Sequence, residues 1–135
     1  MSTTIKPVLS KKNPNYISKH RYYELKHFCL QYPEWRKEYR EIYLEPKSRI
    51  VDTRNDYYIS DSTGSIATRR VELERKMKLV EQTAFAVDPE LSEWLLRAVT
   101  DGLSYETLHG VYGIPCCRET FYERYRRYFK LLSES

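Results

Sequence analysis

Apolar side chains recur at three- and four-residue spacing through most of the chain, which predicts an all-α protein. Between residues 16 and 44 the positions that keep this spacing are Leu25, Phe28, Tyr32, Trp35, Tyr39 and Ile42. Pro33 interrupts the stretch, and a proline inside a helix removes a hydrogen bond and clashes with the preceding turn, at a cost of about 3 kcal/mol. We therefore expect two N-terminal helices, or one sharply kinked helix, with the bend at residues 31–33.

Residues 45–64 lack helical periodicity and contain turn-forming residues, including Pro46 and a run from Ser60 to Gly64. The stretch is predicted to be an exposed linker. A short hairpin, in which Ile50 and Val51 pair with Tyr57 to Ile59, is the alternative.

The longest regular helix is predicted over residues 65–87. Ile66, Leu73, Val80 and Val87 are seven residues apart, with Met77 and Ala84 at the intermediate positions. This heptad pattern is compatible with a homodimer seam. We favour the alternative, in which the same stripe packs against the N-terminal helices of its own chain.

Residues 88–135 are predicted to form three short helices. Asp88 and Pro89 are suited to begin the first, and Gly102 to end it. Ser104 is suited to cap the second helix. The last helix is expected from about Cys117 to Leu132, and four of its apolar residues fall in one narrow stripe: Phe121, Tyr125, Tyr128 and Leu132.

The opposite side of the last helix is polar and carries Glu119, Glu123, Arg126 and Lys130, with Thr120 and Arg127 beside them. A short helix, a glycine-containing turn and a longer basic helix are typical of a helix-turn-helix motif, whose second helix enters the major groove of DNA. Pro115, Cys116 and Cys117 lengthen the turn relative to the tightest motifs. A plain helical hairpin with a solvated charged face is the alternative.

Length and charge suggest how the chain is organised. Its 135 residues suit a basic arm (residues 1–15), N-terminal helices with a linker (16–64), and a long helix with the C-terminal helix-turn-helix (65–135). The net charge is +4, yet residues 1–23 carry five Lys or Arg and no acid, so the remainder sums to −1. The arm is therefore a candidate polyphosphate-binding segment, or else a disordered tail that serves solubility.

Several kinds of chemistry are not indicated. The chain has no phosphate-binding glycine loop, no nucleophile elbow and no His-Glu-x-x-His motif, so we expect no enzyme and no cofactor. Adjacent cysteines without a Cys-x-x-Cys pair do not favour a metal site. Three cysteines, no signal peptide and no long apolar run favour a reduced, cytoplasmic protein away from the membrane.

Three stretches carry a resemblance to a known family: Asp61 to Ala67, Lys78 to Ala84, and the Tyr- and Arg-rich helix-turn-helix ending in Leu131 and Leu132. Over roughly residues 61–132 the chain resembles small proteins of Gram-positive phages and prophages, of the RinA and ArpU late-transcription-activator kind. Their C-terminal half is similar to the sigma-factor domain that reads the promoter −35 element. The family's reading helix begins with a Ser-Arg-Ser-Thr-Tyr-Tyr type run, where this chain has Cys117 to Tyr122.

The resemblance implies a DNA-binding transcription regulator that contacts double-stranded DNA and RNA polymerase. Arg118 and Thr120 would then lie near base edges or flanking phosphate at the start of the reading helix. Glu123, Arg124 and Arg127 would follow along the groove. The residues expected near phosphates are Arg126, Lys130 and, through backbone N–H groups at its helix start, Ser104.

Two other functions remain open from the sequence. The first is a small phage protein that binds and inhibits a host protein, which an exposed patch containing Trp35, Tyr39 and Tyr43 would favour. The second is DNA recognition for genome packaging, as in a small terminase subunit, which predicts a ring of subunits.

Overall fold

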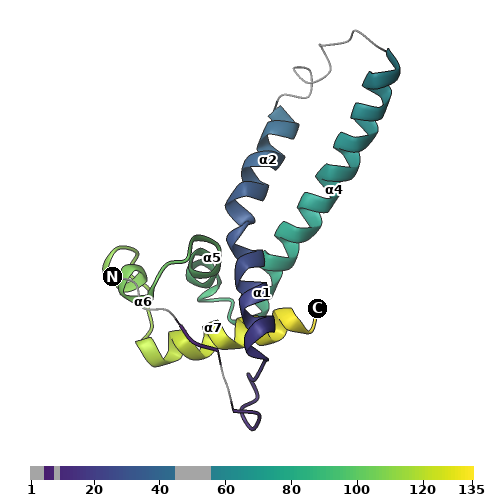
Figure 1. Cartoon of the computed structure of the whole chain (residues 1–135). Helices are drawn as coiled ribbons and strands as arrows, with labels where there is room; N and C mark the ends of the chain where they lie inside the picture. Colours follow the sequence, from purple (N-terminus) through teal and green to yellow (C-terminus); the bar gives the residue numbers. More distant parts are fainter. Residues whose placement is uncertain (1–4, 8–9, 45–55) are drawn as a thin grey trace. The chain divides into compact units, whose positions relative to one another are not determined.

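The computed structural model of the chain describes residues 5–7, 10–44 and 56–135, and the side chains of residues 43–63 lie outside this description. Over the described residues the protein consists of α-helices without a β-strand, so the predicted all-α fold is confirmed (Figure 1). The helices are α1 (Lys19–Leu30), α2 (Tyr32–Leu44), α4 (Asp56–Val87), α5 (Ser92–Asp101), α6 (Tyr105–Gly110) and α7 (Arg118–Ser133).

The interruption at Pro33 separates α1 from α2, as predicted. Helix α1 is capped by Ser18, whose hydroxyl accepts a hydrogen bond from the N–H of Arg21 at 3.3 Å, and it ends at Leu30. Helix α2 begins at Tyr32, so Pro33 lies in its first turn. A proline is tolerated there because the first N–H groups of a helix have no intrahelical partner.

Helix α4 begins nine residues earlier than the sequence pattern indicates. The prediction of a linker through Gly64 is wrong for residues 56–64, which are helical, and the alternative hairpin is wrong because Tyr57 to Ile59 lie in α4. The run from Ser60 to Gly64 contains weak helix formers but no proline, and a glycine inside a helix costs only about 1 kcal/mol relative to alanine. The other half of the hairpin, Ile50 and Val51, lies outside the described residues.

The chain divides into two compact units, unit 1 (residues 1–32 and 79–135) and unit 2 (residues 33–78). The core of unit 1 is formed by α1, the end of α4, and helices α5 to α7. Its most deeply buried side chains are Tyr22, Cys29, Val80, Leu95, Val99, Leu108, Phe121, Tyr128 and Phe129. The predicted apolar stripe of α7 is buried as expected, and Phe129, which the pattern had not included, belongs to the same core.

Buried tyrosine hydroxyls in unit 1 have hydrogen-bond partners. Tyr128 donates its hydroxyl to the carbonyl of Val80 at 3.0 Å, and its oxygen lies 3.7 Å from the sulfur of Cys29. Burial raises the pKa of the Cys29 thiol to about 12, so this cysteine stays protonated and unreactive at neutral pH. The hydroxyl of Tyr22 donates to the backbone carbonyl of Ile5. Aromatic residues therefore fill this core without leaving polar atoms unpaired.

Unit 2 combines part of α2 with part of α4. Trp35 and Ile42 of α2 are 3% and 4% exposed, and Leu73 of α4 is fully buried. Polar contacts join the same helices, because Arg69 binds both carboxylate oxygens of Glu38, at 2.6 Å and 3.0 Å. Trp35 and Ile42 of α2 are thus part of the core of unit 2.

The heptad positions of α4 are largely used inside the chain itself. Leu73, Val80, Ala84 and Val87 are all buried in the single chain. This agrees with the favoured alternative of intrachain packing, and the homodimer seam stays a prediction without support from these residues.

Candidate nucleic-acid interface

Helices α5, α6 and α7 follow one another through two short, well-defined connections. Gly102 ends α5 with a φ of 69°, a left-handed conformation that glycine adopts without steric cost. Ser104 then caps α6, because its hydroxyl accepts the N–H of Thr107 at 3.3 Å. Both features were predicted. The prediction that Asp88 and Pro89 begin this helix is wrong, because α5 begins at Ser92, four residues after Asp88.

Asp88 nevertheless organises the turn before α5. Its carboxylate accepts the N–H groups of Glu90 at 3.0 Å and Leu91 at 3.3 Å. Burial opposes ionisation of Asp88, but hydrogen bonds from Arg124, Leu91 and Glu90 outweigh it, so the pKa of this carboxyl lies below its usual value. The side chain is therefore charged at neutral pH, and it fixes the entry to α5.

The connection between α6 and α7 is longer than in the tightest helix-turn-helix motifs, but it is held in place. Gly113 has a φ of 66°, and the next residue, Ile114, is 4% exposed and donates its N–H to the carbonyl of Leu108 at 3.0 Å. The hydroxyl of Tyr105 donates to the carbonyl of Cys116 at 2.7 Å. The lengthened turn thus positions the start of α7 through contacts with α6.

Helix α7 has a buried face and a polar face. Its buried face packs against α1 and α5 (Figure 1). The residues expected to contact DNA on this helix all lie outside its buried stripe, at different angles around the helix axis. Of these, Arg118 and Arg127 are exposed, and the intermediate ones are Thr120, Glu123, Arg124, Arg126 and Lys130.

Three of the four arginines of α7 pair with carboxylates. Nη2 of Arg118 lies 2.9 Å from Oε1 of Glu106, and Nε of Arg127 lies 3.3 Å from Oε2 of Glu123. Arg124 contacts Glu123 and also Asp88, with its Nε 3.0 Å from Oδ2 of Asp88. The sequence pattern had placed Arg127 beside the polar side of the helix, but it had not indicated the acidic partners of these arginines.

These pairs differ in how readily they would release their arginine. The pairs of Arg118 and Arg127 are well exposed, and exposed ion pairs contribute little to stability. Arg124 and Asp88 have side chains only 29% and 19% exposed, and Asp88 also holds the turn before α5. We therefore interpret Arg124 as a residue that supports the fold, although the sequence had assigned it to the groove.

The remaining predicted residues have different surroundings. The guanidinium of Arg126 donates to the backbone carbonyl of Lys6 at 3.2 Å and lies 5.8 Å from the ring centre of Tyr122. Thr120 is 3.2 Å from the sulfur of Cys117. Ser104 is 5% exposed and is occupied as the cap of α6.

The basic arm contacts α7 at Arg126 and Glu123, which was not predicted from the sequence. Ile5 is 7% exposed, and its carbonyl accepts the hydroxyl of Tyr22. Further along, the amide of Asn15 donates to Glu123 at 3.3 Å. The expectation of a poorly ordered arm is therefore wrong for these residues. The sequence feature that could have indicated this contact is Ile5, an apolar residue between two polar ones.

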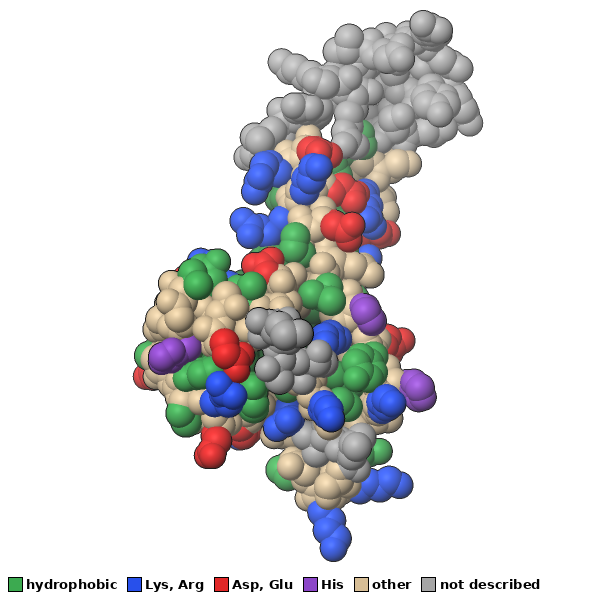
Figure 2. All heavy atoms as spheres, turned by 60° about the vertical axis from the view of Figure 1, so that its left-hand side comes forward, with side chains coloured by type: hydrophobic (Ala, Val, Ile, Leu, Met, Phe, Trp, Pro, Cys, Tyr) green, Lys and Arg blue, Asp and Glu red, His purple; other side chains and the backbone are tan. Residues whose placement is uncertain are grey.

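Lysines of the arm and of the start of α1 are exposed. Lys6, Lys11, Lys12 and Lys19 are all exposed, and none forms an ion pair among the described residues. On the face seen in Figure 2, Lys and Arg side chains gather on the lower part. The arm thus supplies positive charge that the paired arginines of α7 do not.

The two adjacent thiols lie where α7 begins. Cys117 is the N-cap residue and is exposed, and hydrogen bonds from Thr120 lower the pKa of its thiol. Burial raises the pKa of the neighbouring Cys116 thiol. Among the described residues no three His, Cys, Asp or Glu side chains group as metal ligands, and no helix is long and apolar enough to cross a membrane.

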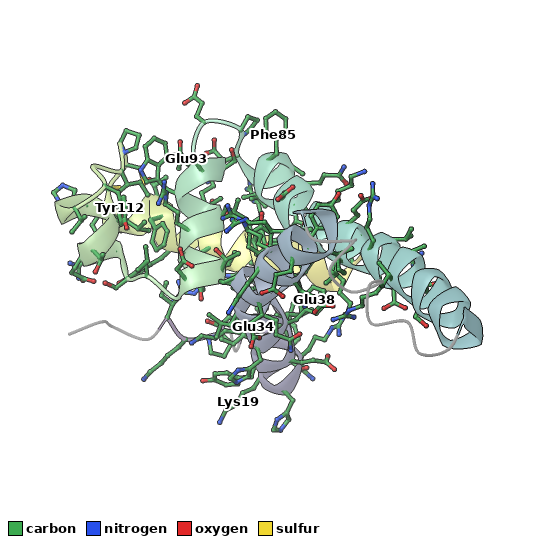
Figure 3. All side chains as sticks on the ribbon, turned by 90° about the horizontal axis from the view of Figure 1, so that it is seen from above. Lys19, Glu34, Glu38, Phe85, Glu93 and Tyr112 are labelled. Atoms are coloured by element: carbon green, nitrogen blue, oxygen red, sulfur yellow. The ribbon has the colours of Figure 1, made fainter. Side chains whose placement is uncertain are left out.

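A separate groove of about 500 Å³ lies between the end of α4 and α5. Its apolar lining includes Phe85, whose side chain is 61% exposed, and Leu96. The acidic residues Glu81 and Glu93 also line it. Figure 3 shows Phe85 and Glu93 on these neighbouring segments of unit 1.

Comparison of the chain with protein-family models, curated proteins and solved structures finds no match. The motifs that carry the family resemblance occupy defined places in the chain. Asp61 to Ala67 and Lys78 to Ala84 both lie in α4, and the run from Cys117 to Tyr122 caps and opens α7.

Proposed function

We propose that the protein is a DNA-binding transcriptional regulator of the phage or prophage kind, which uses α6, the following turn and α7 as a helix-turn-helix. The observation that carries the proposal is the division of α7. Its apolar stripe is buried against α1 and α5, so Arg118 and Arg127 are left exposed, and Lys130 partly exposed, on the rest of the helix after a fixed turn. That is the arrangement by which such motifs present a helix to the major groove.

Residues at the two ends of the α7 face have different tasks in this proposal. Arg118 and Thr120, in the first turn, lie where a reading helix contacts base edges. Arg127 and Lys130 follow along the helix and are suited to phosphates, which position a protein on DNA without specifying sequence. A phosphate would replace Glu106 and Glu123 as the partner of the two exposed arginines. Regulation would further require a contact with RNA polymerase.

Charge reversal on α7 tests the proposal at a single salt concentration. We expect the double variant Arg127→Glu/Lys130→Glu to bind a fluorescein-labelled random-sequence duplex about tenfold or more weakly than wild type, because it removes two cations and adds two anions facing phosphates. Fluorescence anisotropy measures the affinity, and circular dichroism checks that the variant is folded.

The matched control makes the same chemical change in unit 2. Lys37 and Arg40 are exposed on α2, and Lys37→Glu/Arg40→Glu alters the net charge by the same amount. We expect this control to weaken binding much less than the α7 variant. Equal weakening by both variants would mean that net charge alone, rather than the α7 face, determines DNA binding.

A second candidate function is supported by the groove beside Phe85. An exposed aromatic residue next to an apolar groove is typical of protein-binding surfaces. The patch expected for a host-protein inhibitor is not formed in the predicted way, because Trp35 is buried and Tyr39 donates to Glu74 at 2.7 Å. The side chain of Tyr43 lies outside the described residues. If the protein is a protein-binding module of this kind, we expect the variant Arg127→Glu/Lys130→Glu to bind its protein partner as well as wild type does.

The packaging alternative, a small terminase subunit, also involves DNA but requires a ring of subunits. Sedimentation of the free protein separates it from a regulator, because a ring sediments as a species several times the mass of the 16.3 kDa chain.

A further inference from the structure

We propose that the basic arm and the first turn of α1 form a second DNA-contacting element, which lies along the phosphate backbone beside α7. The element consists of Lys6, Lys11, Lys12 and Lys19, and we call it the arm surface. This inference rests on the proposed function and adds a segment whose lysines form no ion pair among the described residues.

The charge balance of α7 is the first argument. Three of its four arginines pair with Glu106, Glu123 or Asp88, and the fourth, Arg126, donates to the backbone of Lys6. To contact a phosphate, each paired arginine must first give up its carboxylate partner. The loss of that ion pair reduces the net free energy gained from the phosphate contact. The lysines of the arm surface have no carboxylate to exchange among the described residues. Their contacts with phosphate therefore release counterions without breaking an intramolecular pair.

The second argument is that the arm is anchored to α7 by two contacts. Arg126 binds the carbonyl of Lys6, and Glu123, about one helical turn away, accepts the amide of Asn15. The chain between these anchors includes a turn, in which the N–H of Asn13 donates to Ser10 at 3.1 Å. Lys11 and Lys12 are part of this turn. They are thus tethered beside the face that the proposed function presents to the groove, as Figure 1 shows for the arm and α7.

The third argument concerns the start of α1. Its first turn contains Lys19, His20 and Arg21 and no acidic residue. Cations at a helix N-terminus are disfavoured by the helix dipole, so Lys19 is not placed there for stability. Figure 3 shows Lys19 at the outer end of α1. A phosphate next to this turn would be favoured both by the lysine and by the positive end of the helix dipole.

The test is a salt titration of duplex binding by the triple variant Lys11→Gln/Lys12→Gln/Lys19→Gln. Each phosphate contact contributes about 0.9 to the slope of log affinity against log salt. We expect the slope to become shallower by about 2 to 3 and the affinity at low salt to fall at least tenfold. The thermal unfolding midpoint should not decrease, because none of these lysines packs in the core and removing Lys19 relieves the helix dipole.

The matched control removes three exposed charges from unit 2, in the variant Lys37→Gln/Arg40→Gln/Lys78→Gln. We expect its salt slope to equal that of wild type. If the arm variant binds with wild-type affinity and slope while Arg127→Glu/Lys130→Glu still weakens binding, the arm inference is overturned and the proposed function stands. If wild type itself does not bind the duplex, both fail.

A parallel titration with phosphatidylserine–phosphatidylcholine vesicles separates DNA from a membrane surface as the source of phosphate. We expect the arm variant to bind the duplex more weakly than wild type, as in the salt titration, while vesicle binding by wild type stays weak. Strong vesicle binding that disappears in the arm variant, with duplex binding unchanged, would assign the arm to an anionic membrane and overturn the inference.

Discussion

Replacing Phe129 with alanine is expected to lower the free energy of unfolding by about 3–5 kcal/mol, the usual range for removing a buried phenylalanine. The Phe129 side chain is fully buried in unit 1. Its ring makes edge contacts with Tyr22, Tyr125 and Tyr128, at centroid distances of 5.1, 5.0 and 5.3 Å. The substitution therefore leaves a cavity and also removes three aromatic contacts that add to the effect of burial. Denaturant unfolding followed by circular dichroism gives the free energy.

Phe85→Ala is the matched control for this prediction. The same side chain is removed, but Phe85 is 61% exposed, so the expected change is within about 0.5 kcal/mol. A Phe129→Ala variant as stable as Phe85→Ala would contradict the aromatic core described for unit 1.

Replacing Trp35 with alanine is expected to destabilise unit 2 by about 3–5 kcal/mol. Trp35 is 3% exposed, and the ammonium group of Lys76 lies 5.6 Å from its ring centre. Burial of the indole contributes more to the stability of unit 2 than its polar contacts do, because those contacts are near the surface, where water screens them. Hydrogen exchange of the amides in residues 33–42 and 64–78 measures the loss within the unit itself.

Glu38→Gln provides the comparison in the same unit. It weakens the contact with Arg69, whose side chain is 38% exposed, and exposed ion pairs contribute little because water screens both partners. We expect its amides to remain much better protected than those of Trp35→Ala. Similar protection in the two variants would mean that the ion pair, rather than the apolar contact, holds α2 to α4.

Much of the fold follows from helical periodicity, because the spacing of apolar residues determines which face of a helix is buried. The stripe from Phe121 to Leu132 and the bend before Pro33 were predictable for this reason. So were the glycine at the end of α5 and the Ser104 cap, since each has a local steric or hydrogen-bonding cause. The start of α4 was not, because a run of Ser, Asp, Thr and Gly weakens a helix without preventing it.

The candidate interface was only partly predictable. Periodicity places Arg118, Arg124 and Arg127 on α7, but it does not tell which acids from other segments will face them. Asp88 is 36 residues from Arg124, and this contact exists only because the turn before α5 packs near α7. The position of the arm likewise depends on Ile5 entering the core of unit 1, a tertiary contact whose partners the sequence does not indicate.

The central claim is that unit 1 binds double-stranded DNA, and the most direct test is the affinity of wild type for a random-sequence duplex as salt is varied. Between about 50 and 200 mM salt, two phosphate contacts alone would lower the affinity about tenfold, and further contacts on the arm surface would steepen the fall. We predict a fall of at least this size, measured by fluorescence anisotropy. Absence of binding at micromolar protein, or an affinity that does not change with salt, would contradict the claim.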